Sequence, residues 1–326
     1  MPNWTMVQAL NQALALELEQ DPRMVIFGED VGKNGGVFRV TDELQACFGE
    51  KRVFDTPISE SGIIGAATGM AMYGLRPVVE IQFAGFAFLA FNQVVSQVSR
   101  MRSRSGGVYG VPLVIRAPFG GGVRTPELHS DNVEAFFMHA PGIKIVIPSN
   151  PYDAKGLLHA AIADPDPVLF LEHMKLYRSF RQEVPADRYT IPIGQAATVH
   201  EGEDVTVITY GAMVQVALQA AQQVERTTDL TVEVIDLRTI SPLDEAAIVA
   251  AVNKTGRAVI VHEAPRTGGV GAEVVALINE HCLYSLLKPV ERVTCPDIPF
   301  PPGKFEDAII PTPERVAKAI LRTLEP

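Results

Sequence analysis

The chain has 326 residues, a formal net charge of −10 and a pI near 5.2. This acidic balance argues against a nucleic-acid-binding protein, which needs a basic surface, and against binding to an anionic membrane. With 47% hydrophobic and 20% charged residues, the composition is typical of a folded α/β protein and is sufficient for two domains of ordinary size.

Cysteine usage and the N-terminal segment indicate a reducing compartment. No C-x-x-C pair occurs, so neither a disulfide framework nor a zinc site is suggested by the three widely separated cysteines, Cys47, Cys282 and Cys295. Residues 5–21 have the pattern of an amphipathic helix that contains Glu17, which is unlike a signal peptide. No apolar run is long enough to cross a bilayer. We therefore expect a cytoplasmic protein that does not contact membranes.

In the first half, short β-branched runs bounded by turn residues alternate with helical stretches. The expected strands are 24–27, 53–57, 77–83, 112–117, 144–148 and 167–171. The expected helices are 5–21, 40–48, 62–73, 86–101, 132–139 and 152–163. This alternation predicts a parallel sheet with helices on both faces.

The pattern lapses over 176–194, where charged residues and prolines accumulate, and a second alternation follows. Its expected strands are 205–210, 231–237, 258–262 and 290–294, and its expected helices are 212–226, 243–253, 272–284 and 313–324. We therefore predict an α/β fold with two tandem parallel-sheet domains, at 1–185 and 197–326, joined by a linker at 186–196.

The stretch T-P-I-S-E-S-G at 56–62 places one carboxylate where an expected strand turns into a helix. Pro57 lacks the N–H that a continuing central strand would need, and Ser59 is a plausible N-cap. Glu60 is therefore held at a defined place. It is either a stabilising charge at a helix N-terminus or a group with a chemical role.

Open parallel sheets bind ligands at the carboxyl ends of their strands. Glu29, Glu60, Gln82 and the loop that follows Arg116 are therefore expected to converge on one crevice. In the stretch E-I-Q-F-A-G-F at 80–86, Gln82 offers a polar contact and Phe86 offers a flat face for a heteroaromatic ring. The alternative is that this stretch is plain core.

The loop P-F-G-G-G-V-R-T-P-E-L-H-S-D-N at 118–132 contains three glycines that allow a close approach to a ligand. Asp131 and Glu134 have the spacing of a capping box, which would place His129 just outside a helix N-terminus. The positive end of that helix would favour a neutral imidazole suited to proton transfer. The alternative is an ordinary loop histidine.

Along nearly its whole length, the chain resembles the β subunit of the thiamine-diphosphate-dependent decarboxylase component of 2-oxo acid dehydrogenase complexes, of the pyruvate and branched-chain types. The stretches that carry this resemblance are T-M-V-Q-A-L at Thr5, F-G-E-D-V-G at Phe27, G-G-V-F-R at Gly35, D-T-P-I-S-E-S-G at Asp55, E-I-Q-F-A-G-F at Glu80, L-H-S-D at Leu128, P-Y-D-A-K-G-L-L at Pro151 and E-V-I-D-L-R-T-I-S-P-L-D at Glu233. The resemblance implies a transketolase-like pyrimidine-binding domain followed by a transketolase C-terminal-like domain.

The resemblance also implies roles for the singled-out residues. Glu60 would hydrogen-bond a ring nitrogen of the aminopyrimidine and favour the tautomer that takes the proton from the thiazolium carbon. His129 would face the 2-oxo acid and the incoming lipoyl group. The residues expected around the cofactor are Glu29, Ile58, Glu60, Gln82 and Phe86. A structural potassium ion is implied within 161–166, at Ala161, Asp164 and Asp166, mainly through backbone carbonyls.

The family's motif for Mg²⁺ and the diphosphate, G-D-G followed by an asparagine, is absent from this chain. The resemblance therefore implies an α subunit that holds both groups, a heterotetramer of two α and two β chains, and activity only with α present. The C-terminal domain is expected to dock the dihydrolipoyl acyltransferase core with its lipoyl domain.

Pyruvate is the substrate we expect, because P-E-L-H-S-D resembles the pyruvate type. The stretch E-A-F-F-M-H-A-P-G instead resembles the branched-chain type, which is one alternative. The others are an acetoin-cleaving relative and a non-catalytic assembly subunit.

Overall fold

The structure is a computed structural model that describes residues 1–325. They form two compact units, which are described separately. Unit 1 consists of Met1–Gly120 and Leu128–Ile193, and unit 2 consists of Gly121–Glu127 and the chain from Gly194 onward. The domain boundaries expected from the sequence, at 185 and 197, stay predictions.

Unit 1 is built on a parallel sheet whose strands follow the order β6-β7-β5-β4-β2-β3. These strands are β2 (Met24–Gly28), β3 (Val53–Asp55), β4 (Arg76–Glu80), β5 (Val114–Phe119), β6 (Lys144–Val146) and β7 (Val168–His173). They lie where the hydrophobic runs predicted strands, with shifts of a few residues at the ends. A separate antiparallel pair joins β1 (Asn3–Trp4) to β8 (Gln182–Glu183).

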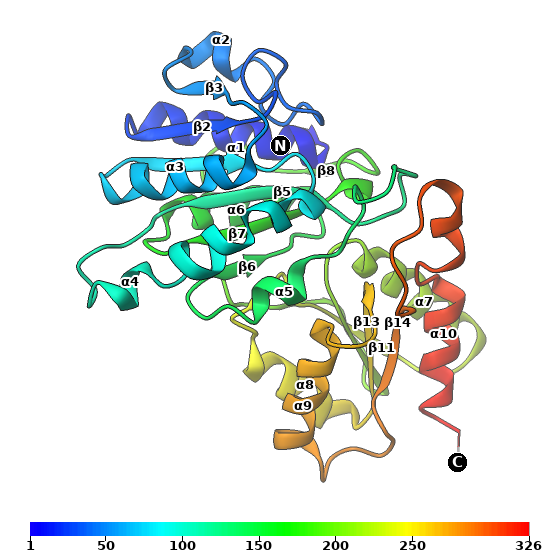
Figure 1. Cartoon of the computed structure of the whole chain (residues 1–326). Helices are drawn as coiled ribbons and strands as arrows, with labels where there is room; N and C mark the ends of the chain where they lie inside the picture. The colour runs from blue at the N-terminus through cyan, green and yellow to red at the C-terminus, as the bar shows by residue number, and fades with distance from the viewer. Residues whose placement is uncertain (326) are drawn as a thin grey trace. The chain divides into compact units, whose positions relative to one another are not determined.

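Two long helices of unit 1 begin at residues whose side chains cap their free N–H groups. Helix α1 (Met6–Gln20) has a capping box between Thr5 and Gln8, and α6 (Pro151–Ala163) is capped by the Asn150 side chain. These two helices pack against each other, and α3 (Glu60–Met72) packs against β4 (Figure 1). Ser59 is the N-cap of α3, as predicted, although its side chain makes no capping hydrogen bond. The short helices are α2 (Leu44–Phe48), α4 (Met101–Arg104) and α5 (Glu134–Met138).

The single helix predicted over 86–101 is wrong. The chain forms a 3₁₀ segment (Ala84–Ala90), a π-helical segment (Gln93–Val98) and then α4. A non-local contact shapes the start of this region, because a Cβ on Gly85 would lie only 2.1 Å from the carbonyl oxygen of Leu128. Helix periodicity alone carries no information about such a contact.

The capping box predicted at Asp131 is also wrong. Helix α5 starts at Glu134, its N-cap is Val133, and no side chain caps it. Glu134, expected three residues inside the helix, is instead its first residue, and it is fully buried.

Unit 2 has a sheet in the order β14-β13-β10-β11-β9. Strands β10 (Val205–Thr209), β11 (Val232–Asp236), β13 (Ala258–Pro265) and β14 (Glu291–Cys295) are parallel, and β9 (Ala197–His200) is an antiparallel edge strand. Within this unit α7 (Met213–Thr227) packs with α10 (Pro313–Arg322), and α8 (Glu245–Thr255) packs with α9 (Val270–Cys282), on opposite sides of the sheet (Figure 1). The short strand β12 (Thr239–Ser241) and a 3₁₀ segment (Gly303–Ala308) complete the unit.

Candidate active site

The carboxyl ends of β2, β3 and β4 bring the predicted acidic and amide side chains to one edge of the sheet of unit 1. Glu29 directly follows β2, Glu60 opens α3 after β3, and Gln82 follows β4 by two residues. Because these three strands are parallel neighbours, their carboxyl ends lie at the same edge.

Two of these residues form a buried pair of carboxyl groups. Glu29 is 6% exposed and Glu60 is 5% exposed. The Ser59 backbone N–H donates to Glu29, but Oε1 of Glu29 is buried with no hydrogen-bond partner. Burial, and then the negative charge of Glu60, raise the pKa of Glu29. The pair therefore has an unfilled position for a hydrogen-bonding ligand and can carry a proton.

Gln82 completes this edge through a contact with the segment after β2. Its Nε2 donates to Oδ2 of Asp30 at 2.8 Å. The neighbouring strands approach so closely that a Cβ on Gly28 would lie 2.4 Å from the carbonyl oxygen of Glu80. Glycine at position 28 therefore allows the ends of β2 and β4, and the side chains beyond them, to lie together.

His129 lies in an aromatic cluster. Its ring centroid is 4.4 Å from that of Phe83 and 5.2 Å from that of Phe86, and the Phe83 ring also contacts Phe38 at 5.7 Å. The predicted position of His129 just outside a helix N-terminus is wrong, since α5 begins five residues later. The contacts of this imidazole with Phe83 and Phe86 are tertiary contacts, since both rings come from the segment after β4. Sequence reasoning missed Phe38 and Phe83. Phe83 lies in the stretch that supplies Gln82 and Phe86, and Phe38 lies in the G-G-V-F-R stretch at 35–39.

Part of the loop that precedes His129 is fixed within unit 2. The Gly121 N–H donates to Oε1 of Glu263 at 2.5 Å, and the Arg124 N–H donates to Oε1 of Glu306 at 2.9 Å. The Arg124 side chain also pairs with Asp307 at 2.9 Å. Acidic side chains of unit 2 therefore hold this loop at Gly121 and at Arg124.

A buried ion network that the sequence analysis did not anticipate ties β4, β5 and β7 together. Arg116 pairs with Glu80 at 2.7 Å and with Glu172 at 2.6 Å, and the Tyr177 hydroxyl donates to Glu172 at 2.7 Å. Burial raises the pKa of Glu80 and of Tyr177, and the two carboxylates raise the pKa of Arg116 despite its burial. The Tyr177 ring packs on Phe38 at 4.9 Å, which connects the network to the aromatic cluster. The sequence signal for this network was a charged residue in each of three largely apolar strands, namely Glu80, Arg116 and Glu172.

Ile58 and Phe86 are the remaining predicted cofactor contacts. Ile58 precedes α3, and its side chain is 85% exposed. Phe86 is half-buried beside His129. Both side chains therefore present apolar surface that a flat ring could cover.

The residues predicted to hold potassium lie at the end of α6. The Asp164 carboxylate accepts from Nζ of Lys144 at 2.7 and 2.6 Å, and Asp166 pairs with Arg102 at 2.5 Å. The Ala161 carbonyl accepts from the Asp164 N–H at 3.3 Å. Because both carboxylates already face a cation, a potassium ion here would depend on backbone carbonyls, and this site stays a prediction.

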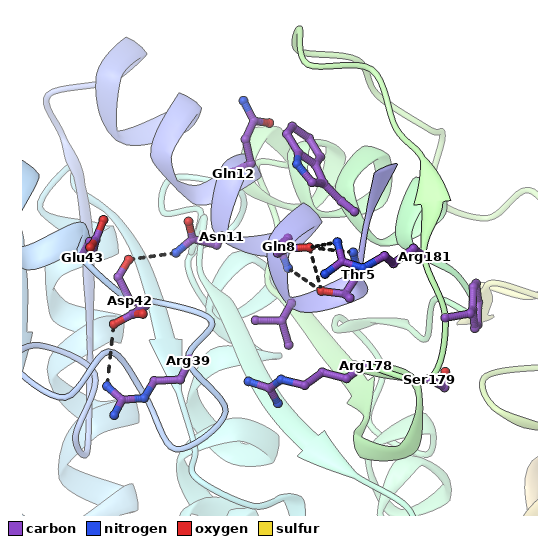
Figure 2. Close-up of a pocket in the computed structure, with 13 residues that line it drawn as sticks. Thr5, Gln8, Asn11, Gln12, Arg39, Asp42, Glu43, Arg178, Ser179 and Arg181 are labelled. Atoms are coloured by element: carbon purple, nitrogen blue, oxygen red, sulfur yellow. Dashed lines mark hydrogen bonds and ion pairs between the residues drawn. The ribbon is translucent and has the colours of Figure 1, made fainter. Parts of the chain in front are cut away.

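A separate cavity of about 830 Å³ in unit 1 is lined by none of the predicted site residues. Figure 2 shows its walls, which come from the start of α1, the loop at 39–43 and the segment 178–181. Arg178 of this cavity donates to the carbonyl oxygen of Phe38 at 2.8 Å. Volume alone does not identify the active site, since this cavity contains no buried carboxyl pair.

The structure fits the pyrimidine half of thiamine diphosphate but not a complete metal site. Glu29 supplies an unpartnered buried oxygen, Glu60 a second buried carboxyl group, and Phe86 an aromatic face. Among residues 1–325, no group of three or more His, Cys, Asp or Glu side chains is placed to share a metal ion. Within the same residues, no helix is long and apolar enough to span a membrane.

The sequence matches two family descriptions that together cover most of the chain. The transketolase pyrimidine-binding domain matches residues 3–179, and the transketolase C-terminal domain matches residues 194–316. Each match contains one of the two sheets described above.

Individual relatives match over the full length. The pyruvate dehydrogenase E1 component subunit beta of Staphylococcus aureus is 55% identical over 325 residues, covering 100% of both chains. The protein of the same name from Bacillus subtilis (strain 168) is 54% identical over the same length. Among solved structures, a split-gene transketolase described as an inactive beta4 tetramer has a TM-score of 0.81 and 23% identity over 99% of each chain. At that identity the likeness concerns the fold alone.

Proposed function

The chain belongs to the family of pyruvate dehydrogenase E1 component β subunits, and from this we propose that it acts in the oxidative decarboxylation of pyruvate and the transfer of the acetyl group to lipoyl groups. The family is thiamine diphosphate-dependent, and the chain has the α/β fold of the transketolase-like superfamily. The named relatives favour pyruvate over the branched-chain and acetoin alternatives.

The observation that carries this proposal is the buried pair of Glu29 and Glu60 with its unpartnered oxygen. Glu60 binds a ring nitrogen of the aminopyrimidine, and Glu29 lies beside it as a second carboxyl group of raised pKa. Ile58 and Phe86 flank the pyrimidine. When bound, thiamine diphosphate supplies the electron sink for the loss of carbon dioxide.

His129 faces the substrate and the incoming lipoyl group. The aromatic cluster holds its imidazole in one orientation, which places a proton donor or acceptor without the need to reorganise water. Gln82 and Asp30 support the wall of the same crevice through their hydrogen bond.

An α subunit provides the half of the site that this chain lacks. It holds Mg²⁺ and the diphosphate, because the G-D-G motif is absent from the sequence. Two α and two β chains then form a heterotetramer that acts with a dihydrolipoyl acyltransferase core and its lipoyl domain. A potassium ion at the end of α6 would be structural.

The test is Glu60→Gln in the chain co-expressed with an α subunit that carries the G-D-G motif. We expect pyruvate decarboxylation, measured with an artificial electron acceptor, to fall about 100-fold or more, because an amide cannot exchange a proton with the pyrimidine. Assembly, measured by size-exclusion chromatography, should be unchanged.

The matched control is Glu50→Gln, which makes the same chemical change at an exposed position. Its turnover should equal that of the unchanged chain. Near-normal turnover of Glu60→Gln would refute the proposed role and favour a non-catalytic assembly subunit.

A further inference from the structure

A second cavity, of about 430 Å³, lies in unit 2 beside the ends of β13 and β14. We call it the Arg266 cavity. Its lining includes three arginines, one carboxylate and two apolar residues, namely Arg266, Arg292, Arg315, Asp297, Pro296 and Ile309. None of these residues belongs to the proposed catalytic machinery.

Neutral carbonyl groups, and not carboxylates, hold the three guanidinium groups. Arg266 Nη1 donates to the Arg292 carbonyl at 3.2 Å, and Arg292 Nη1 donates to the Arg266 carbonyl at 3.3 Å. Arg315 donates to the carbonyl groups of Ile309 and Thr294 at 2.8 and 2.7 Å. Within residues 1–325, none of the three forms an ion pair. Since each guanidinium has five N–H donors, most of these donors are available to a ligand.

The single carboxylate of the cavity is already engaged. Asp297 accepts from the Thr267 N–H at 2.8 Å and from the Thr267 hydroxyl at 2.7 Å, one bond to each oxygen. Three positive groups therefore share one negative group. This excess of positive charge occurs in a chain whose net charge is −10.

The positive charges of Arg266 and Arg292 also repel each other. Burial, followed by the charge of Arg266, lowers the pKa of Arg292, while Asp297 acts in the opposite direction. Folding thus places three like charges around a single acid, Asp297. A bound anion would offset the repulsion among these groups.

We propose that the Arg266 cavity binds the phosphate group of a small phosphate ester. A phosphate monoester carries about −1.5 to −2 charges at neutral pH, which balances the excess of positive charge. The planar forks of arginine match phosphate oxygens in bidentate geometry. Pro296 and Ile309 provide an apolar wall for the organic part, and the volume falls within the range of small-molecule sites.

The experiment titrates inorganic phosphate, and then glycerol 3-phosphate, into the full-length chain by calorimetry, with ionic strength held constant by sodium chloride. We expect saturable binding that weakens tenfold or more in Arg292→Gln and in Arg266→Gln. Arg266→Lys should also weaken binding, because it keeps the charge but removes the planar fork. Arg266 is exposed, so its variants are expected to fold, and thermal melting checks this.

The matched control is Arg226→Gln, which removes the same charge from an exposed position in α7 of the same unit. Unchanged phosphate binding in this variant is expected. Equal weakening in Arg226→Gln, no saturable binding in the unchanged chain, or tighter binding of citrate than of either phosphate compound would each overturn the proposal.

Glu60→Gln distinguishes this site from the proposed cofactor site. Phosphate binding should be the same in Glu60→Gln as in the unchanged chain, whatever its turnover. Loss of phosphate binding in Glu60→Gln would overturn the assignment to the Arg266 cavity.

Discussion

Glu29 shows how one buried carboxyl group makes stability depend on pH. Its pKa in the folded protein lies above the ordinary value of 4.5, because burial and the charge of Glu60 both disfavour ionisation. The folded state therefore binds this proton more readily than the unfolded state. The resulting stabilisation is fully present below pH 4.5 and is lost as the pH rises through the folded pKa.

Glu29→Gln removes this pH dependence, since the amide cannot ionise. The change that it causes in the free energy of unfolding should therefore be more favourable to the folded state at pH 8 than at pH 4.5. Urea unfolding of both chains across this pH range measures the difference in the free energy of unfolding. Glu50→Gln provides the exposed comparison. A difference that moves in the opposite direction with pH would show that Glu29 is stabilised as a carboxylate.

His129 should matter more for transfer to the lipoyl group than for decarboxylation. We expect His129→Ala, in the assembled enzyme, to reduce acetyl transfer onto a lipoyl domain more than it reduces turnover with an artificial electron acceptor. The exposed His139, changed to alanine, is the control. Equal losses in the two assays would contradict the proposed role.

At the scale of elements, α6 is connected to the segment after Glu183 through one buried amine. Nζ of Lys155 donates to the carbonyl groups of residues 185, 186 and 187 at 2.6, 2.9 and 3.0 Å. It also lies over the rings of Trp4 and Tyr189, at 5.3 and 5.5 Å from their centroids. Burial lowers the pKa of Lys155 from 10.5 to about 8.

The sign of the pH effect is opposite to that at Glu29. Between pH 8 and 10.5 the unfolded chain binds more protons at Lys155 than the folded chain does. The contribution of Lys155 to the free energy of unfolding therefore increases with pH. Lys155→Met should destabilise the chain by about 2 kcal/mol at pH 7, because it removes charged hydrogen bonds. This loss should grow as the pH rises from 8 to 10.

Urea unfolding at pH 7, 8, 9 and 10 tests the effect, and Lys33→Met, at an exposed position, is the control. A loss that shrinks as the pH rises would mean that the carbonyl groups and aromatic rings stabilise the charged amine more than burial disfavours it. The range stops at pH 10 because tyrosines titrate above it.

At the scale of the whole molecule, the chain supplies one part of a cofactor site. We expect calorimetry with thiamine diphosphate and Mg²⁺ to show no binding to this chain alone and saturable binding once an α subunit with the G-D-G motif is present. Residues 1–325 place no acidic cluster for the metal, which is the physical basis of this expectation.

Tight binding to the lone chain would contradict the shared site. The Glu60→Gln variant in the mixture serves as the control for specificity, because it should weaken binding of the pyrimidine half while leaving the diphosphate contacts of the α subunit intact.

The sequence by itself determined the alternation of strands and helices, the two-sheet α/β architecture and the family. These features depend on local rules, namely hydrophobic runs, turn residues and N-caps such as Ser59, and on motif stretches that are specific in combination. The sequence also placed Glu29, Glu60 and Gln82 after the ends of expected strands. Neighbouring parallel strands bring their carboxyl ends to the same edge of a sheet.

Only the tertiary structure decided the features that depend on contacts between distant residues. Separate 3₁₀ and π-helical segments occur where one helix was expected over 86–101, next to the close approach of Gly85 to the Leu128 carbonyl. Helix α5 begins at Glu134 without the capping box expected at Asp131. The network around Arg116 and the three guanidinium groups of the Arg266 cavity likewise join segments far apart in the chain. Charge balance and close packing are set in three dimensions, whereas a periodic pattern reports only on neighbours along one element.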